Sequence, residues 1–69
     1  MVDGNYVASV RKKLRLSQGA AAKLFGGGVN AFSRYETGAG VPPVSLVLLL
    51  HLLDKHPELL DEIRVGRQI

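Results

Sequence analysis

Three consecutive glycines, Gly26 to Gly28, lie within residues 17–36 and constrain the fold of this chain more than any other feature. Glycine readily takes the left-handed backbone conformations that end a helix and form a tight turn. Small apolar residues precede the run, so the segment predicts two short helices joined by a glycine turn. A nucleotide-binding loop is not expected, because no Lys-Ser/Thr follows the glycines and no strand is expected before them. The layout is that of a helix-turn-helix DNA reader.

The rest of the chain also predicts short helices. Apolar periodicity and end signals place five of them at about residues 6–14, 18–25, 29–37, 45–55 and from 57 onward, with a frayed tail at 65–69. Asn5 and Ser17 are suited to cap the first two, because their side-chain oxygens accept hydrogen bonds from free backbone amides. The expected fold class is all-α, a compact five-helix bundle. We expect one domain over residues 1–69, with the helix-turn-helix at about 17–37 and a dimerisation region at about 44–65.

The segment 45–55 is apolar nearly all round. One stripe at helical spacing contains Leu46, Leu49, Leu50 and Leu53, and a second group, Val47, Leu48 and Leu52, is left over. A chain of 69 residues has too little material to cover both faces of such a helix. We therefore expect a homodimer in which Val47, Leu48 and Leu52 form the interface.

Two contacts between the expected helices follow from the residue types. Gly19 to Ala22 are small, as required where the two helices of a helix-turn-helix cross closely, although alanine also favours helix by itself. Glu36 is placed to form an ion pair with Arg11 or Lys12. Such a pair would hold the first helix against the third.

Positive charge is concentrated in the first half of the chain, whose net charge is +3 overall. Residues 1–36 carry six Lys and Arg side chains against two carboxylates, whereas residues 37–69 carry three against four. The positive charge thus accompanies the expected reading helices, as it would if that end of the domain faced DNA phosphates. The alternative is that the basic cluster at residues 11–15 only solvates one face of a helix.

Composition also argues against several kinds of site. The chain has no cysteine, and His51 and His56 lack the partners of a ligand set, so neither a disulfide nor a metal site is expected. No nucleophile–base pair and no suitably spaced carboxylates are found, which predicts a protein that is not an enzyme and has no cofactor. The N-terminus lacks the features of a secretory signal, and the longest apolar stretch is about half of the roughly 20 residues that span a bilayer. We expect a cytoplasmic protein without a membrane partner.

The pattern of the central segment resembles that of the phage-repressor/Cro (XRE) family. The matching residues are Ser17, Gln18, Ala21, Ala22, Gly26, Tyr35, Glu36, Gly38 and Pro42. A closer similarity, to the C-terminal DNA-binding domain of MqsA-type antitoxins, covers most of residues 7–64 and rests on the segments 10–14, 25–36 and 53–60. The resemblance implies a five-helix bundle of the repressor/Cro type and a repressor of a toxin–antitoxin operon.

Asn30 and Arg34 are the expected base-contacting residues. They are four positions apart, so a helix presents both on one face, and a helix fits the major groove, where all four base pairs differ. Asparagine suits a bidentate contact with adenine and arginine one with guanine. The resemblance to MqsA-type antitoxins implies the same two residues. The alternative is a helix cap for Asn30 and a surface cation for Arg34.

Other residues are candidates for contacts with the DNA backbone, which fix the register without reading the sequence. Gln18 and Ser33 are the first of these, although Gln18 could equally be a solvated residue of a first helical turn. Gly28 could contribute a backbone amide, since Gly28 and Val29 stand where many repressors carry polar side chains. The remaining candidates are Ser17, Lys12, Lys13 and Lys23.

One reader of this kind makes too few contacts for specific binding, so we expect a two-fold dimer on a palindromic operator of double-stranded DNA. The resemblance also implies a zinc-binding N-terminal domain that neutralises a cognate toxin. Without cysteines this chain cannot build that domain, so a toxin is expected as a partner only through a domain outside the chain. The chain itself would then be an excised or naturally short DNA-binding half. The alternative interpretation is a small helical protein–protein interaction module that binds no specific DNA.

Overall fold

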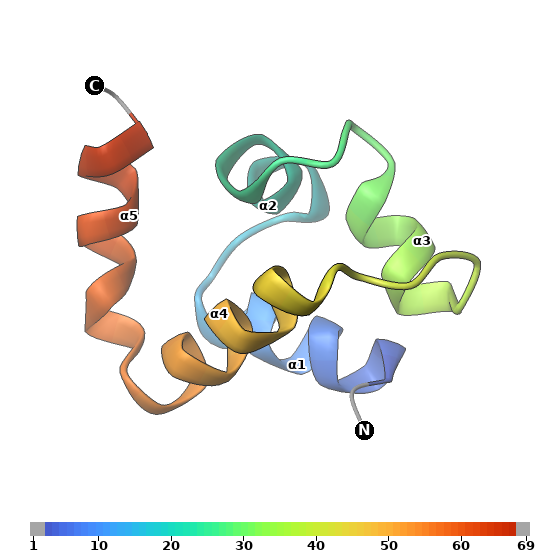
Figure 1. Ribbon diagram of the computed structural model, residues 1–69, viewed down its shortest axis with the longest axis horizontal. Coiled ribbons are helices and arrows are strands. Elements are labelled where there is room, and N and C mark those ends of the chain that lie inside the picture. Colours follow the sequence, from blue (N-terminus) through green and yellow to red (C-terminus); the bar gives the residue numbers. More distant parts are fainter. Residues whose placement is uncertain (1–2, 68–69) are drawn as a thin grey trace.

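The computed structural model describes residues 3–67, and within this range every regular element is helical (Figure 1). The elements in chain order are α1 (Gly4–Lys13), α2 (Gln18–Phe25), α3 (Ala31–Thr37), α4 (Val44–Lys55), the short 3₁₀ helix η1 (Pro57–Leu59) and α5 (Leu60–Arg67). The prediction of an all-α fold with five helices is confirmed for these residues. In the view of Figure 1, α4 lies in front of α1, with α2 above, α3 on the right and α5 on the left.

The first helix begins earlier than predicted. α1 starts at Gly4, because Asp3 rather than Asn5 caps it: the Asp3 carboxylate accepts a hydrogen bond from the N–H of Tyr6 at 2.9 Å. The extended backbone of Asp3 is typical of an N-cap residue. The start of α4 also lies one residue before the expected position, at Val44.

The third helix and the C-terminal segment differ in extent as well. α3 begins at Ala31 rather than at residue 29, because the N–H of Ala31 bonds back to the carbonyl of Gly28 at 3.1 Å and the turn runs through Asn30. Pro57 does begin a helical segment, but its first turn is η1, and α5 follows to Arg67. Residues 65–67, expected to fray, are helical, and residues 68 and 69 lie outside the described range.

The core lies between α1 and its two neighbours, α3 and α4. Its fully buried large side chains are Val7, Val10, Phe32, Leu50 and Leu53. The ring of Phe32 is in contact with two others, since its centroid lies 6.0 Å from that of Phe25 and 5.5 Å from that of Tyr35. Full burial of a large apolar side chain contributes roughly 1.5–3 kcal/mol. Burial of Phe32 and its contact with Phe25 therefore help to hold α3, the expected reading helix, against both α1 and α2.

Small residues bring helices close at two places. Ala21 and Ala22 of α2 are buried, whereas residues 19 and 20 are exposed, so only the second half of the predicted crossing is buried. The other close approach is at Gly4 of α1. A Cβ atom at this position would overlap the backbone of Glu36 near the end of α3.

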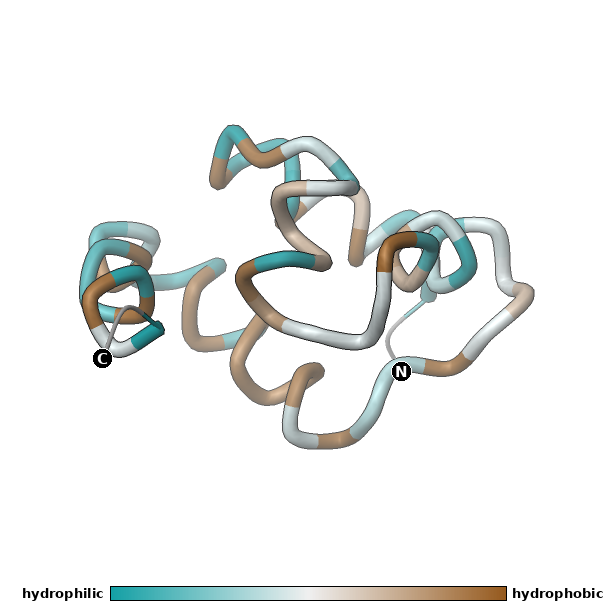
Figure 2. Tube along the Cα trace, turned by 90° about the horizontal axis from the view of Figure 1, so that it is seen from above, coloured by the Kyte–Doolittle hydropathy of each residue, from teal (hydrophilic) through white to brown (hydrophobic). Residues whose placement is uncertain are grey.

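The outer face of α4 is apolar and exposed. Its buried stripe is Leu46, Leu50 and Leu53, with Leu49 packed against the core. Leu48 and Leu52 are 63% and 48% exposed, while Val47 is half-buried. Figure 2 shows the nearly continuous hydrophobic stretch of α4 along one edge of the molecule. None of the helices within residues 3–67 combines the length and hydropathy of a membrane span.

Candidate nucleic-acid interface

The turn between α2 and α3 has a backbone that glycine adopts far more easily than other residues. Gly26, Gly27 and Gly28 have φ angles of 90°, 100° and 95°. Gly26 also has a ψ angle of −176°, in a region that is essentially restricted to glycine. The predicted glycine turn is therefore confirmed. Within residues 3–67 no described hydrogen bond has the N–H of Gly27 or Gly28 as its donor, and both residues are exposed.

Asn30 and Arg34 border one hollow beside this turn, which we call the α3 hollow. It has a volume of about 440 Å³ and is lined by residues 27–31, by Arg34 and Tyr35, and by Gly40 and Val41. Both residues are exposed, but only Arg34 lies within α3: Asn30, predicted to lie on the helix, is its N-cap residue because the preceding turn runs through it, and its side chain makes no capping hydrogen bond. The structure thus places the two predicted base-contacting residues on one concave surface.

The loop after α3 completes this hollow, which no pattern in the sequence predicted. Gly38 takes the left-handed conformation with a φ angle of 87°, and the N–H of Gly40 then bonds to the carbonyl of Arg34 at 3.1 Å. The loop consequently folds back beside α3 and places Val41, which is 90% exposed, at the edge of the hollow. A loop rich in glycine and proline predicts a helix end but not the direction of the chain after it.

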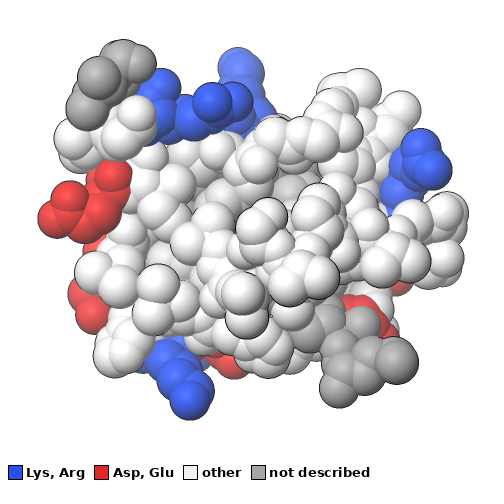
Figure 3. Space-filling model, in the orientation of Figure 1, with Lys and Arg blue, Asp and Glu red and all other residues white. Residues whose placement is uncertain are grey.

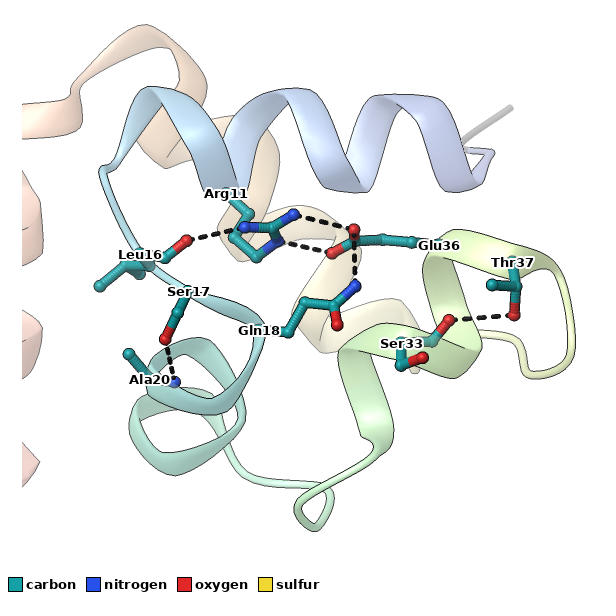
Figure 4. Close-up of polar contacts among 8 residues, drawn as sticks. All are labelled: Arg11, Leu16, Ser17, Gln18, Ala20, Ser33, Glu36 and Thr37. Atoms are coloured by element: carbon teal, nitrogen blue, oxygen red, sulfur yellow. Dashed lines mark hydrogen bonds and ion pairs between the residues drawn. The ribbon is translucent and has the colours of Figure 1, made fainter.

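An ion pair connects α1 to α3 and is the main polar contact behind the candidate surface (Figure 4). The guanidinium of Arg11 donates to the carboxylate of Glu36 through Nε at 2.7 Å and through Nη2 at 3.0 Å. Arg11 also donates to the carbonyl of Leu16 at 2.8 Å, and the side-chain amide of Gln18 donates to Glu36 at 3.1 Å. The predicted pairing of Glu36 with Arg11 is confirmed, and it joins α1, α2 and α3.

The electrostatics of this pair favour its charged form. The hydrogen bonds from Arg11 lower the pKa of Glu36, with a smaller contribution from Gln18, while partial burial opposes the shift. The same contact with Glu36 raises the pKa of Arg11. The positive charge of Lys12 also lowers the pKa of Glu36. Glu36 therefore holds three elements together as a carboxylate.

The hydroxyl-bearing candidates for backbone contacts have different surroundings. Ser17 caps α2, because its Oγ accepts a hydrogen bond from the N–H of Ala20 at 3.0 Å, which confirms the predicted cap. Ser33 lies in the first turn of α3 and is half-buried, and its carbonyl accepts from the hydroxyl of Thr37 at 3.0 Å. Gln18 stands between them at the start of α2, with its amide directed to Glu36 (Figure 4).

The three candidate lysines do not lie together. Lys12 is exposed on α1, and Lys23 is exposed in the last turn of α2. Lys13 is instead bound to α4, where its Nζ lies 3.2 Å from the carboxylate of Asp54 and also contacts the Asp54 carbonyl. Lys13 is thus engaged between α1 and α4 and away from the residues that line the α3 hollow.

A polar network between α1 and α4 was not foreseen from the sequence. The hydroxyl of Tyr6 donates to the carboxylate of Asp54 at 3.1 Å and lies 3.0 Å from Nδ1 of His51. Burial raises the pKa of Tyr6, and the hydrogen bond from Lys13 lowers that of Asp54. These residues are more than forty positions apart in sequence, so only the packing of α1 on α4 brings them together.

Within residues 3–67 the protein is thus all-helical, and two short helices joined by a glycine turn present the exposed residues Asn30 and Arg34 on one surface. A family model described as the antitoxin component of a bacterial toxin–antitoxin system, MqsA, matches residues 1–64. The chain is 61% identical over 59 residues to the antitoxin MqsA of Escherichia coli strain K12, covering 86% of this chain and 45% of the relative. It is 33% identical over 57 residues to the antitoxin HigA-2 of Vibrio cholerae, covering 83% of this chain and 55% of the relative.

The chain belongs to the MqsA antitoxin family. The resemblance to MqsA-type antitoxins is confirmed, whereas placement in the XRE group stays an interpretation. The chain spans about half the length of the curated relatives it matches. The zinc site implied by the resemblance does not fit the residues present, since the chain has no cysteine and residues 3–67 contain no cluster of three potential ligands.

Proposed function

We propose that this chain is the DNA-binding part of an antitoxin and acts as a sequence-specific transcriptional repressor of the repressor/Cro type. The observation that carries the proposal is the α3 hollow, where Asn30 and Arg34 lie exposed beside the glycine turn. A helix placed in the major groove by this surface would present both side chains to base edges. Each bidentate contact, Asn30 with adenine and Arg34 with guanine, would supply about 1–3 kcal/mol of discrimination.

Contacts with the DNA backbone would fix the register of this helix. Three groups are available for phosphate contacts, because none of them is used in the described hydrogen bonds or ion pairs: the backbone amides of the exposed Gly27 and Gly28, and the cation of Lys12. Gln18 would contribute its remaining polar atoms, held in position by its hydrogen bond to Glu36. The hydroxyl of Ser17 is already used as the cap of α2, whereas the described hydrogen bond of Ser33 engages only its backbone carbonyl, so Ser33 would be the better hydroxyl donor to a phosphate.

The repressor would act as a homodimer on a palindromic operator. The exposed side chains of Leu48 and Leu52, together with the half-buried Val47, form an apolar strip on α4. Figure 3 shows that the face of the molecule over α4 is largely free of charged side chains, which are found around its margin. Two copies joined through this strip would bury apolar surface and present two reading helices to successive half-sites.

Neutralisation of a toxin would belong to the part of the protein that lies outside this chain. The relatives are named antitoxins, and the chain corresponds to about half of their length. A toxin would therefore be a partner of the complete antitoxin, while this domain would bind the DNA. The exposed apolar strip of α4 also supports an alternative function, that of a protein–protein interaction module without specific DNA binding.

Binding of the chain to its own upstream DNA tests the proposal. The 69-residue protein would be titrated against a labelled upstream duplex and a scrambled duplex by fluorescence anisotropy at about 150 mM salt, where nonspecific binding is weak. We expect a preference of about a hundredfold or more for the upstream duplex. Equal and weak binding to both duplexes would contradict the proposal and favour the interaction module.

A further inference from the structure

We propose that Lys23, Arg64 and Arg67 form a second DNA-binding surface, between α2 and α5, that holds backbone phosphates beside the segment read by α3. This inference rests on the proposed function and deepens it. The three cations surround a hollow of about 280 Å³ with Leu16, Ala20 and Leu24 between them. We call this surface the α2–α5 groove.

The groove continues to the glycine turn. A larger hollow of about 840 Å³ is lined by Lys23 and Arg67, by residues 26–29 of the turn, and by Gly19, Ala20 and Ala22 of α2. The same turn borders the α3 hollow, so the two surfaces share residues 27–29. A nucleic-acid strand that leaves the reading helix past the turn would enter the α2–α5 groove directly.

The charge of the groove suits a polyanion. Within residues 3–67, no hydrogen bond or ion pair engages Lys23 or Arg67. Arg64 faces Asp61 across 3.8 Å with both side chains exposed, an arrangement that contributes little. In Figure 3 the basic side chains gather at the upper margin, over the C-terminal end of α5 and the neighbouring α2. Arginine and lysine in this position offer donors for phosphate oxygens.

The apolar floor of the groove supports the same interpretation. Leu16 is buried and Leu24 half-buried, so the methylene stems of Lys23 and Arg67 can lie on apolar surface while their charged ends stay outside. Arg67 reaches this groove from beyond the range matched by the family model, which ends at residue 64. Neither Asn30 nor Arg34 lines the α2–α5 groove, so it is a surface separate from the one proposed to read the DNA sequence.

A purely structural explanation makes a different prediction. Lys23 lies in the last turn of α2, and Arg64 and Arg67 lie in the last turn of α5, where cations interact favourably with the helix dipole. That role concerns the stability of the helices and leaves DNA binding unchanged. Lys55 provides a matched control, because it is an exposed cation in the last turn of α4 and borders neither hollow.

The salt dependence of DNA binding tests the proposal. Affinities of the 69-residue chain and of Lys23→Gln, Arg67→Gln and the double variant would be measured for the upstream and scrambled duplexes over a range of salt concentrations. Each lost phosphate contact lowers the slope of log K against log salt by about 0.9, so the double variant should lose roughly 1.8. The affinity should fall equally for both duplexes, because phosphate contacts carry no sequence information. Lys55→Gln should keep the slope, as should Arg67→Lys.

The outcomes separate this proposal from the proposed function. If the wild-type chain prefers its upstream duplex but the double variant keeps the wild-type slope, the groove does not bind phosphate and only this inference is overturned. An equal loss of slope in Lys55→Gln would show an effect of net charge and overturn it as well. If the wild-type chain has no preference for upstream DNA, the proposed function fails. Far-UV circular dichroism would confirm that each variant is folded.

Discussion

Replacement of Glu36 with alanine should destabilise the fold strongly. The side chains of Glu36 and of its partner Arg11 are 10% and 12% exposed, with two hydrogen bonds of 2.7 and 3.0 Å between them. Removal of one partner from a buried ion pair leaves an uncompensated charge, which costs about 3–5 kcal/mol. Because the pair retains some exposure, water can reach the guanidinium, and we expect a loss of about 3 kcal/mol in the free energy of unfolding.

This loss is large compared with the total stability of a domain of this size. Stabilities of about 0.05–0.15 kcal/mol per residue give roughly 3–10 kcal/mol for the 69-residue chain. Urea unfolding followed by far-UV circular dichroism measures the difference. The midpoint of the Glu36→Ala variant should fall to a much lower urea concentration at an unchanged slope, since the surface exposed on unfolding is the same.

Two further variants test the reasoning. The double variant Arg11→Met with Glu36→Leu removes both charges and should recover part of the lost stability, as found for apolar replacements of buried pairs. Asp61→Ala removes only an exposed contact with Arg64 at 3.8 Å and should cost far less. A change of less than about 0.5 kcal/mol in the free energy of unfolding of Glu36→Ala, the usual range for surface substitutions, would contradict this role of the ion pair. A double variant no more stable than the single one would contradict it as well.

Three other predictions follow from the same structure. The hydrogen bonds from Arg11 lower the pKa of Glu36, so this carboxylate stabilises the fold above the unfolded-state pKa of about 4.3. That contribution to the free energy of unfolding is lost as the pH falls further. Glu36→Gln should flatten the pH dependence of stability measured in urea titrations across acidic pH. Gly4→Ala should lower the free energy of unfolding by about 1–3 kcal/mol, because its Cβ would overlap backbone atoms of α3. Gly19→Ala, with open space around the new Cβ, should raise the free energy of unfolding by about 0.5–1 kcal/mol in the same assay. Equal effects of the two substitutions would contradict this packing. Leu48→Glu with Leu52→Glu should convert a dimer to a monomer in sedimentation equilibrium, and an unchanged mass would exclude this face as the interface.

Much of the fold was predictable because local chemistry determines it. The glycine turn, the Ser17 cap and the buried stripe of α4 each depend on residue types within one or two helical turns. The pairing of Arg11 with Glu36 was also predictable, since one of few carboxylates in the first half of the chain faces a basic cluster. The start of α1 was not, because Asp3 and Asn5 are both good caps and only the packing decides between them.

The candidate site was predictable where it lies within one short segment and unpredictable where it joins distant segments. Asn30 is the N-cap residue of α3, and its carbonyl accepts a hydrogen bond from the N–H of Arg34 at 3.1 Å, so the two residues are still one helical turn apart and share a surface. The approach of Arg67 to Lys23 depends on the direction of α5 relative to α2, which no local pattern encodes. In the same way, the attachment of Lys13 to α4 follows from tertiary packing and not from its position in a basic run.

The specificity of the Asn30→Ala, Arg34→Ala double variant shows whether these two residues read the DNA sequence. The ratio of the Kd for the scrambled duplex to the Kd for the upstream duplex would be measured for this variant, for the wild-type chain and for Thr37→Ala, an exposed control on the same helix. Loss of two bidentate base contacts of about 1–3 kcal/mol each predicts a fall of about 30-fold or more in the ratio, with no change for the control. A folded double variant that keeps the wild-type ratio would contradict the claim that these two residues read the DNA sequence.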